Sequence, residues 1–199
     1  MDIFVTLSSY SQSSDVPINL LEESGLNYQI NNLGRRMTPD EVLQYAKNSK
    51  VIIAGVEEYS SVTLEKLPYL ECISRCGSGV DSIDLHHAKN AKIAILNTPE
   101  EPVNAVAELT LTMILSLLKK LPSVNADTHN RLWKRSTGKL LKYKTVGIMG
   151  FGRIGKQVAT LLKPFGVNIL IFDPLIKNIT GQNIIQSEKF EDFLSSSDI

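Results

Sequence analysis

The stretch that decides the fold is Thr145-Val146-Gly147-Ile148-Met149-Gly150-Phe151-Gly152-Arg153-Ile154-Gly155. Its apolar start predicts a buried strand, and the glycines that follow open a helix predicted over about 152–163. In a Gly-x-Gly-x-x-Gly turn the first glycine allows a tight turn, the second admits a diphosphate, and the third lets helix and strand pack closely. Free N–H groups and the helix dipole attract the phosphates. The predicted cofactor-binding residues are therefore Gly150, Gly152, Arg153, Ile154 and Gly155, with Arg153 adding a cation nearby.

Asp173-Pro174 follows the next predicted strand, 167–172, and Asp173 comes eighteen residues after Gly155. A carboxylate at this strand end can accept hydrogen bonds from the adenine-ribose hydroxyls. It also repels a 2′-phosphate, which favours NAD over NADP provided that no cation intervenes. Asp173 and Pro174 therefore complete the predicted cofactor site.

Two other interpretations of this region remain open. The glycines could form an ordinary strand-to-helix turn, with Asp173 as a surface cap. A related turn also binds S-adenosylmethionine in methyltransferases, although the third glycine and Asp173-Pro174 weigh against that alternative.

Short apolar runs alternate with helix-like segments upstream of the glycine turn, which is typical of a parallel sheet covered by helices. One helix is expected to open at Pro17 and to close at Gly25. Another begins at Thr38, where Glu41 completes a capping-box spacing around Pro39. The sequence therefore predicts an α/β fold, with buried strands at 3–7, 51–54, 72–74 and 93–96.

A longer helix is predicted over 105–118, with Pro122 as its stop. Leu109, Met113 and Leu117 recur on one face of this helix, and we expect that face to pack into the core. A second sheet then begins with a strand predicted over 145–149, and a further helix is expected over about 188–195.

Composition restricts the possible partners. Of the 199 residues, 43% are hydrophobic and 21% are charged, as in an ordinary globular protein. Lys and Arg number 21, the same as Asp and Glu, so no net positive field favours nucleic acid. Residues 1–10 lack a basic region and a long apolar run, and no stretch approaches a membrane span. With only Cys72 and Cys76 as thiols, we expect a cytoplasmic protein without disulfides. Neither nucleic acid nor a membrane is expected as a partner.

Several ordered blocks resemble one known family, the D-isomer-specific 2-hydroxyacid dehydrogenases, and most closely their phosphoglycerate-dehydrogenase-like branch. Besides the glycine turn, the blocks are Asn32-Leu33-Gly34-Arg35-Arg36, Ile73-Ser74-Arg75-Cys76-Gly77-Ser78-Gly79-Val80-Asp81 with Ile83-Asp84, Asn97-Thr98-Pro99, and Ala105-Val106-Ala107-Glu108. The resemblance covers essentially the whole chain.

The resemblance implies a flavodoxin-like substrate domain over residues 1–98, followed by a Rossmann dinucleotide-binding domain over 99–199 that is incomplete at its C-terminal end. The hinge is expected near 98–104. Within the second domain, Val106, with Asn104 near it, is expected at the nicotinamide end of the cofactor site. Glu100-Glu101-Pro102 departs from the small residues that the family pattern has there.

In this family the segment matching 75–80 is the substrate loop, whose backbone amides hold the substrate carboxylate. Gly77 and Gly79 flank Ser78 after a buried strand, which suits a nest of N–H groups for a small anion. An ordinary strand-to-helix turn closed by Asp81 explains the same letters. The predicted substrate-binding residues are Arg75, Gly77, Ser78 and Gly79.

The family reaction moves a hydride between the nicotinamide and C2 of a 2-hydroxy acid, with His as acid/base, Glu tuning that His, and Arg orienting the substrate. All three are expected beyond Ile199, because His86, His87 and His129 match none of these positions, and no metal site is expected. We therefore expect an inactive part of a homodimeric enzyme for a small 2-hydroxy or 2-keto acid, with a 3-phosphoglycerate-like molecule as one candidate. The alternatives are a noncatalytic NAD-binding sensor module and a domain that binds S-adenosylmethionine.

Overall fold

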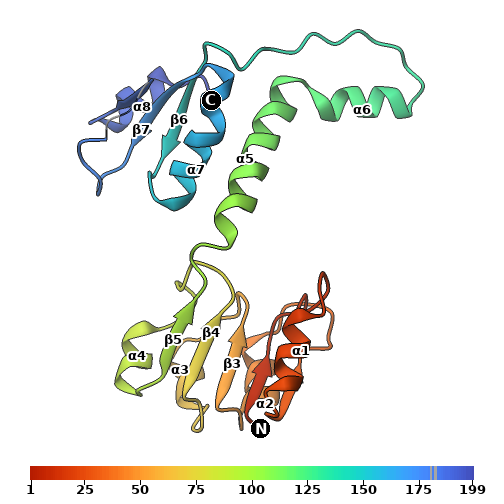
Figure 1. The fold of residues 1–199 in the computed structure, drawn as a ribbon, viewed down its shortest axis with the longest axis vertical. Coiled ribbons are helices and arrows are strands. Elements are labelled where there is room, and N and C mark those ends of the chain that lie inside the picture. The colour runs from red at the N-terminus through yellow and green to blue at the C-terminus, as the bar shows by residue number, and fades with distance from the viewer. Residues whose placement is uncertain (180, 182) are drawn as a thin grey trace. The chain divides into compact units, whose positions relative to one another are not determined.

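The computed structural model describes residues 1–179, 181 and 183–199 (Figure 1). Their contacts divide the chain into two compact units, Met1–Glu101 and Pro102–Ile199. Each unit is a parallel sheet with helices, so the predicted α/β class is confirmed.

The first unit is built on a five-stranded parallel sheet in the order β2-β1-β3-β4-β5. This is the flavodoxin-like order predicted for the substrate-side domain. The strands are β1 (Ile3–Val5), β2 (Tyr28–Ile30), β3 (Val51–Ala54), β4 (Cys72–Arg75) and β5 (Ala94–Asn97).

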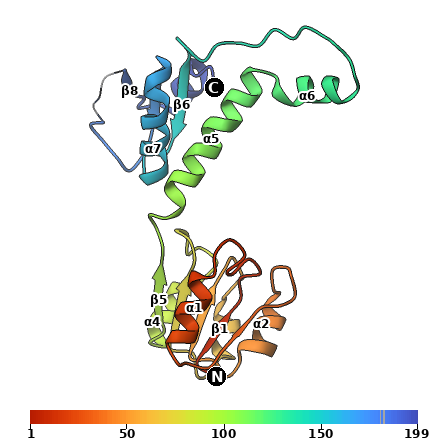
Figure 2. The same cartoon turned by 45° about the vertical axis from the view of Figure 1, so that its right-hand side comes forward.

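Helices cover both faces of this sheet because successive strand residues point to opposite sides. Ile3 and Val5 pack with Leu21 of α1 (Val16–Glu23) on one face. Phe4, between them, faces the other core, formed with α2 (Pro39–Ala46), α3 (Ser61–Glu65) and α4 (Leu85–Asn90). Figure 2 shows α1 lying against the sheet near β1.

Local sequence signals explain where two of these helices begin. Thr38 and Glu41 form the predicted capping box at the start of α2, with proline in its first turn. Asp84 caps α4 by accepting a hydrogen bond from the His87 N–H at 2.8 Å.

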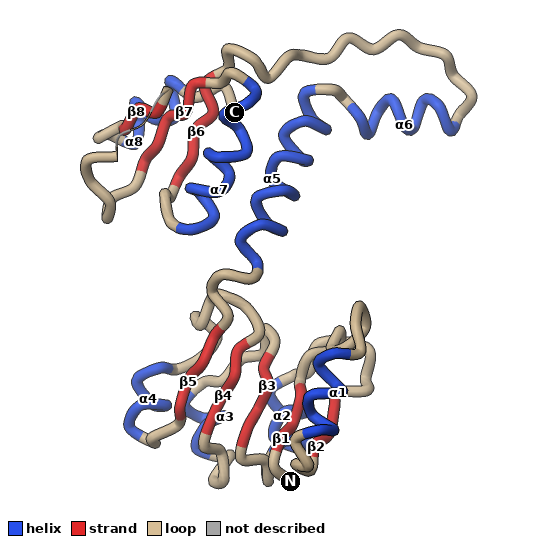
Figure 3. Tube along the Cα trace, viewed as in Figure 1, coloured by secondary structure: helices blue, strands red, loops and turns tan. Residues whose placement is uncertain are grey.

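The second unit has three parallel strands in the order β6-β7-β8, as Figure 3 shows. They are β6 (Thr145–Met149), β7 (Asn168–Phe172) and β8 (Ile184–Gln186). The helices are α5 (Pro102–Leu118), α6 (Leu121–His129), α7 (Arg153–Leu162) with a 3₁₀ turn at Lys163–Phe165, and α8 (Phe190–Ser196). Buried side chains of β6, β7 and α7 form its core, into which Ala107 of α5 also packs.

The last residues lie along β6. The Asp198 N–H donates to the Thr145 carbonyl, and the Gly147 N–H donates to the Ile199 carbonyl, each at 2.8 Å. The backbone at Gly147 is close to Ser197 and Phe193, because a Cβ there would lie 2.3 Å from Ser197 Oγ. Residues 198–199 therefore pair with the backbone of β6.

The prediction that Leu109, Met113 and Leu117 pack into the core was wrong. Their side chains are 58%, 56% and 73% exposed in the described structure. The face of α5 that packs carries Ala107 with Leu111, Ile114, Leu115 and Leu118. Both faces of this helix are apolar, so periodicity alone did not separate them.

Several short elements have no clear sequence signal. The pattern missed β2, β8 and α3, which are only three to five residues long. It also missed α6, because Pro122 was interpreted as a helix stop and instead lies in the first turn of that helix. Proline is tolerated there because its missing N–H would have no partner anyway.

No single helix in the described part of the chain is long and apolar enough to cross a membrane. The pair α5 and α6 meets that test together, but the two helices are bent by 65° at their junction.

Candidate cofactor-binding site

The glycine turn lies between β6 and α7. At each of its three glycine positions, glycine is suited for a different physical reason. Gly150 has φ +90°, a conformation that side chains rarely adopt. A Cβ on Gly155 would lie 2.2 Å from the Gly150 carbonyl oxygen, so only glycine allows this packing. A Cβ on Gly152 would meet nothing within 4 Å. The space beside Gly152 is therefore open for a ligand.

The backbone donors of this turn are divided between the protein and open space. The Gly150 N–H donates to the Phe172 carbonyl at 2.9 Å, which fixes the turn to the end of β7. Within the described residues, the N–H groups of Gly152 and Ile154 carry no hydrogen bond. Together with the exposed Arg153 at the first position of α7, these groups form a cradle for an anion.

Asp173 connects the glycine turn to the loop after β7. Its Oδ2 accepts from the Phe151 N–H at 2.7 Å, and its Oδ1 accepts from the N–H groups of Leu175 and Ile176 at 2.9 and 3.1 Å. These hydrogen bonds lower the pKa of Asp173, and the one from Phe151 has the largest effect. The side chain is therefore a carboxylate at neutral pH, and Oδ2 keeps a lone pair for another donor. Sequence reasoning gave Asp173 a ribose-binding role, with a surface cap as the alternative, but it did not predict the hydrogen bond from Phe151.

A groove of about 510 Å³ lies beside Asp173. Its lining residues come from the ends of β7 and β8, the carboxyl edge where parallel α/β sheets bind ligands: Phe172, Asp173, Pro174, Lys177, Asn178, Gln186, Ser187 and Glu188. The sequence analysis did not predict that residues at the end of β8 and after it line this groove, because it missed β8 itself. Lys177 places a cation in this groove. The sequence argument against a 2′-phosphate required that no cation intervene, and this requirement is not met.

The start of α5 is fixed against α7, where the Gln157 side chain donates to Asn104 Oδ1 at 2.8 Å. Val106, two residues further on, is 39% exposed. Its contact with the nicotinamide stays a prediction.

The predicted substrate turn follows β4 in the first unit. Gly77 has φ +137°, and its N–H donates to Thr98 Oγ1 at 2.7 Å. The Asn97 amide donates to the Ser78 carbonyl at 2.8 Å. The N–H groups of Ser78, Gly79 and Val80 have no hydrogen-bond partner within the described residues, so they are free to bind an anion.

Arg75 is already occupied within its own loop. Its guanidinium donates to the Cys76 carbonyl and lies against Gly77. Its Nε is buried without a partner among the described atoms. The predicted contact of Arg75 with a substrate therefore requires this side chain to change its conformation.

A buried acid near this turn was missed by the sequence analysis. Glu57 is 2% exposed, and its Oε2 accepts from Thr6 Oγ1 at 2.7 Å and from the Gly55 N–H at 2.9 Å. Burial raises the pKa of the neighbouring Tyr59. The hydrogen bonds of Glu57 join the carboxyl ends of β1 and β3. No motif in the sequence marks Glu57 or Tyr59.

The histidines lie on helices, away from both turns in the sequence: His86 and His87 on α4, and His129 at the end of α6. In the part of the chain that the structure describes, no cluster of His, Cys, Asp or Glu could hold a metal ion.

Comparison with known proteins relates this chain to one family. Residues 111–199 match the family model described as "D-isomer specific 2-hydroxyacid dehydrogenase, NAD binding domain". The D-3-phosphoglycerate dehydrogenase of Bacillus subtilis (strain 168) is 32% identical over 152 residues, which are 75% of this chain and 29% of that protein. The enzyme of the same name from Methanocaldococcus jannaschii is 36% identical over 153 residues, 74% of this chain and 29% of that protein.

A solved structure agrees with these matches. The NAD⁺-bound 3-phosphoglycerate dehydrogenase of Entamoeba histolytica is 26% identical, with a TM-score of 0.77 over 99% of this chain and 60% of that one. The chain thus spans less than a third of the length of the two curated relatives. By these matches the chain belongs to the D-isomer specific 2-hydroxyacid dehydrogenase family, and its second unit carries the NAD-binding domain.

Proposed function

We propose that the protein to which this chain belongs transfers a hydride between NAD and C2 of a small D-2-hydroxy acid. The observation that carries this proposal is the cradle beside Gly152, which is open, rich in free N–H groups and adjacent to Asp173. Bound NAD would supply the hydride acceptor. The membership of the chain in a dehydrogenase family supports the same reaction.

The residues of the second unit hold and orient the dinucleotide in this proposal. The N–H groups of Gly152 and Ile154 bind the diphosphate, and Arg153 adds positive charge at the same helix end. Asp173 accepts a hydrogen bond from a ribose hydroxyl through the free lone pair of Oδ2. Pro174 forms part of the groove in which the adenosine end lies.

The first unit binds the substrate carboxylate in this proposal, through the N–H groups of Ser78, Gly79 and Val80. The candidate substrate is a small 2-hydroxy or 2-keto acid. A 3-phosphoglycerate-like molecule is the finer proposal, and the names of the curated relatives support it.

The 199-residue chain itself is proposed to bind NAD without turnover. Its three histidines lie on α4 and α6, and none belongs to either predicted turn. The same observation keeps a noncatalytic NAD-binding module as the second candidate function.

A second copy of the chain is the proposed partner of the exposed stripe on α5. Leu109, Met113 and Leu117 lie one helical turn apart and are each more than half exposed. A homodimer would remove this stripe from water. Replacing Met113 with Glu should then lower the dimer fraction in sedimentation equilibrium, whereas an unchanged mass would contradict the proposal.

The proposed function is tested by NADH titration followed by an assay of NADH consumption with a panel of 2-keto acids. We expect saturable NADH binding that S-adenosylmethionine does not compete for, and no turnover by the chain alone. Absence of NADH binding by folded protein would contradict the cofactor role. Turnover at ordinary enzyme rates would contradict the proposed inactivity of this chain.

A further inference from the structure

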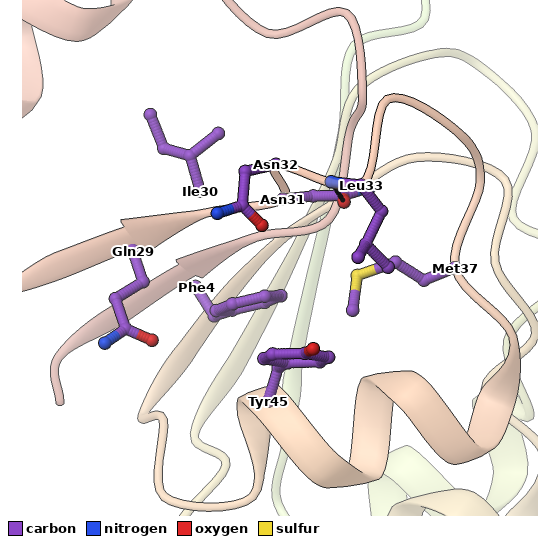
Figure 4. Close-up of a pocket in the computed structure, with 8 residues that line it drawn as sticks. All are labelled: Phe4, Gln29, Ile30, Asn31, Asn32, Leu33, Met37 and Tyr45. Carbon is purple, nitrogen blue, oxygen red and sulfur yellow. Dashed lines mark hydrogen bonds between the residues drawn. The ribbon is translucent and has the colours of Figure 1, made fainter.

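A second hollow lies in the first unit, between the edge strand β2 and helix α2, and none of the residues discussed above as cofactor or substrate ligands line it (Figure 4). Its volume is about 330 Å³, within the range of small-molecule sites. The chemistry of its walls indicates what it could bind.

One wall is aromatic. The rings of Phe4 and Tyr45 are nearly parallel, with 14° between their planes and 6.3 Å between their centroids. Phe4 and Met37 are buried at the base, while the Tyr45 side is 41% exposed. Figure 4 shows the two rings lying one above the other, with Met37 at one side. An accessible ring over an apolar base is a surface on which another planar ring can stack.

The rim carries amides whose hydrogen-bonding groups are free. The side chains of Gln29 and Asn32 line the hollow, and neither has a hydrogen-bond partner within the described residues. Asn31, between Ile30 and Asn32, differs: its amide nitrogen donates to the Thr6 and Arg35 carbonyls at 2.7 and 2.9 Å, and its oxygen accepts from the Leu33 N–H. One amide is therefore structural, and two are available to a ligand that both donates and accepts.

No charged side chain is among the residues that line this hollow. A charged ligand would lose part of its hydration there without gaining a partner, which is costly. We propose that this hollow is a binding site for a small uncharged molecule with a planar ring that carries a carboxamide-like donor and acceptor. The ring stacks on Tyr45, and the amide pairs with Gln29 and Asn32.

Benzamide is the probe that tests this proposal, with benzoate as its charged analogue and cyclohexanecarboxamide as its non-planar analogue. The three are titrated into the full chain and followed by two-dimensional NMR of backbone and side-chain amides. The titrations are run with and without NADH, so that the result does not depend on cofactor binding. We expect benzamide to shift the Gln29 and Asn32 side-chain signals and to bind at least about tenfold more tightly than either analogue.

Variants locate the binding. Tyr45→Ala should weaken benzamide binding about tenfold, whereas Tyr69→Ala, at an exposed tyrosine outside the hollow, should leave it unchanged. Gln29→Ala gives a second test at an exposed position if Tyr45→Ala does not fold. The proposal is overturned if benzamide shifts no signal around the hollow, if benzoate binds equally well, or if the folded variants bind like the unmodified chain.

Discussion

The turn after β6 and the turn after β4 look alike in the sequence, since each places spaced glycines directly after a buried parallel strand. The structure builds them differently. The turn after β6 leads at once into the ten-residue helix α7. Close packing of the Gly155 backbone against the Gly150 carbonyl holds this turn in place. The turn after β4 leads into no helix until Leu85, and the side chains of Thr98 and Asn97 hold it from β5 and the residue after it.

The difference shows that a glycine pattern specifies a site only through what surrounds each glycine. At Gly155 the neighbour of an added Cβ is a backbone oxygen, which cannot move away cheaply. At Gly77 the neighbour is the Arg75 side chain, which can rotate, although φ remains unfavourable. The turn after β6 is therefore rigid because of backbone packing, whereas a few side-chain hydrogen bonds hold the turn after β4.

The largest effect is expected for Gly155→Ala. The added methyl group would overlap the Gly150 carbonyl and force α7 away from β6, at a cost of about 1–3 kcal/mol. Urea unfolding of the variant and the unmodified chain measures this cost. An unchanged unfolding midpoint would show that the close approach of helix and strand is not a constraint.

Thr98→Val should have the next largest effect, because it leaves the Gly77 N–H without its acceptor. The expected loss is about 1 kcal/mol in the free energy of unfolding of the first unit, together with faster amide exchange at residues 76–80. Thr112→Val is the matched control, since Thr112 donates only to a carbonyl within the exposed side of α5. If both variants behave alike, Thr98 does not hold the turn.

Asp173→Asn should lower stability at neutral pH and lose this effect in acid. Because the pKa of Asp173 is lowered by the Phe151 and Leu175 N–H groups, its stabilisation is present above the ordinary carboxyl pKa. It is lost as the pH falls through the lowered value. Thermal unfolding across this pH range, with Asp192→Asn of α8 as control, measures the difference. A gap between variant and unmodified chain that grows in acid would contradict the assigned hydrogen bonds.

Gly79→Ala should have the smallest effect. A Cβ there would meet only Asp81 Oδ2 at 3.5 Å, an ordinary contact, so the unfolding free energy should change by less than about 0.5 kcal/mol. A large loss would mean that the turn after β4 is as closely packed as the turn after β6.

Sequence reasoning went furthest where a local signal has one physical cause. Strands β3 and β6 were predicted at their observed bounds, and the Thr38 capping box was predicted with its partner Glu41. The glycine turn was predicted from the need for a tight turn, for room beside the backbone and for close packing of helix and strand. Strands β2 and β8 and helix α3 were missed because polar residues interrupt them, so that they lack a continuous apolar run like that of β3.

The rest of the site depends on contacts between distant residues. The second role of Asp173 arises from its contact with Phe151, twenty-two residues earlier in the chain. Glu57 is buried through hydrogen bonds to Thr6 and Gly55, and Lys177 shares a groove with residues after β8. Periodicity in the sequence carries no information on such pairings, so only the folded chain reveals them.

The most direct test of the cofactor site is the NADH affinity of Gly152→Ala, measured by calorimetric titration beside the unmodified chain. An added Cβ at Gly152 meets no protein atom within 4 Å, so the variant should keep its stability. The methyl group would instead occupy the space of the diphosphate, and affinity should fall at least about tenfold. Unchanged NADH affinity in the folded variant would contradict the assignment of this turn as the dinucleotide site.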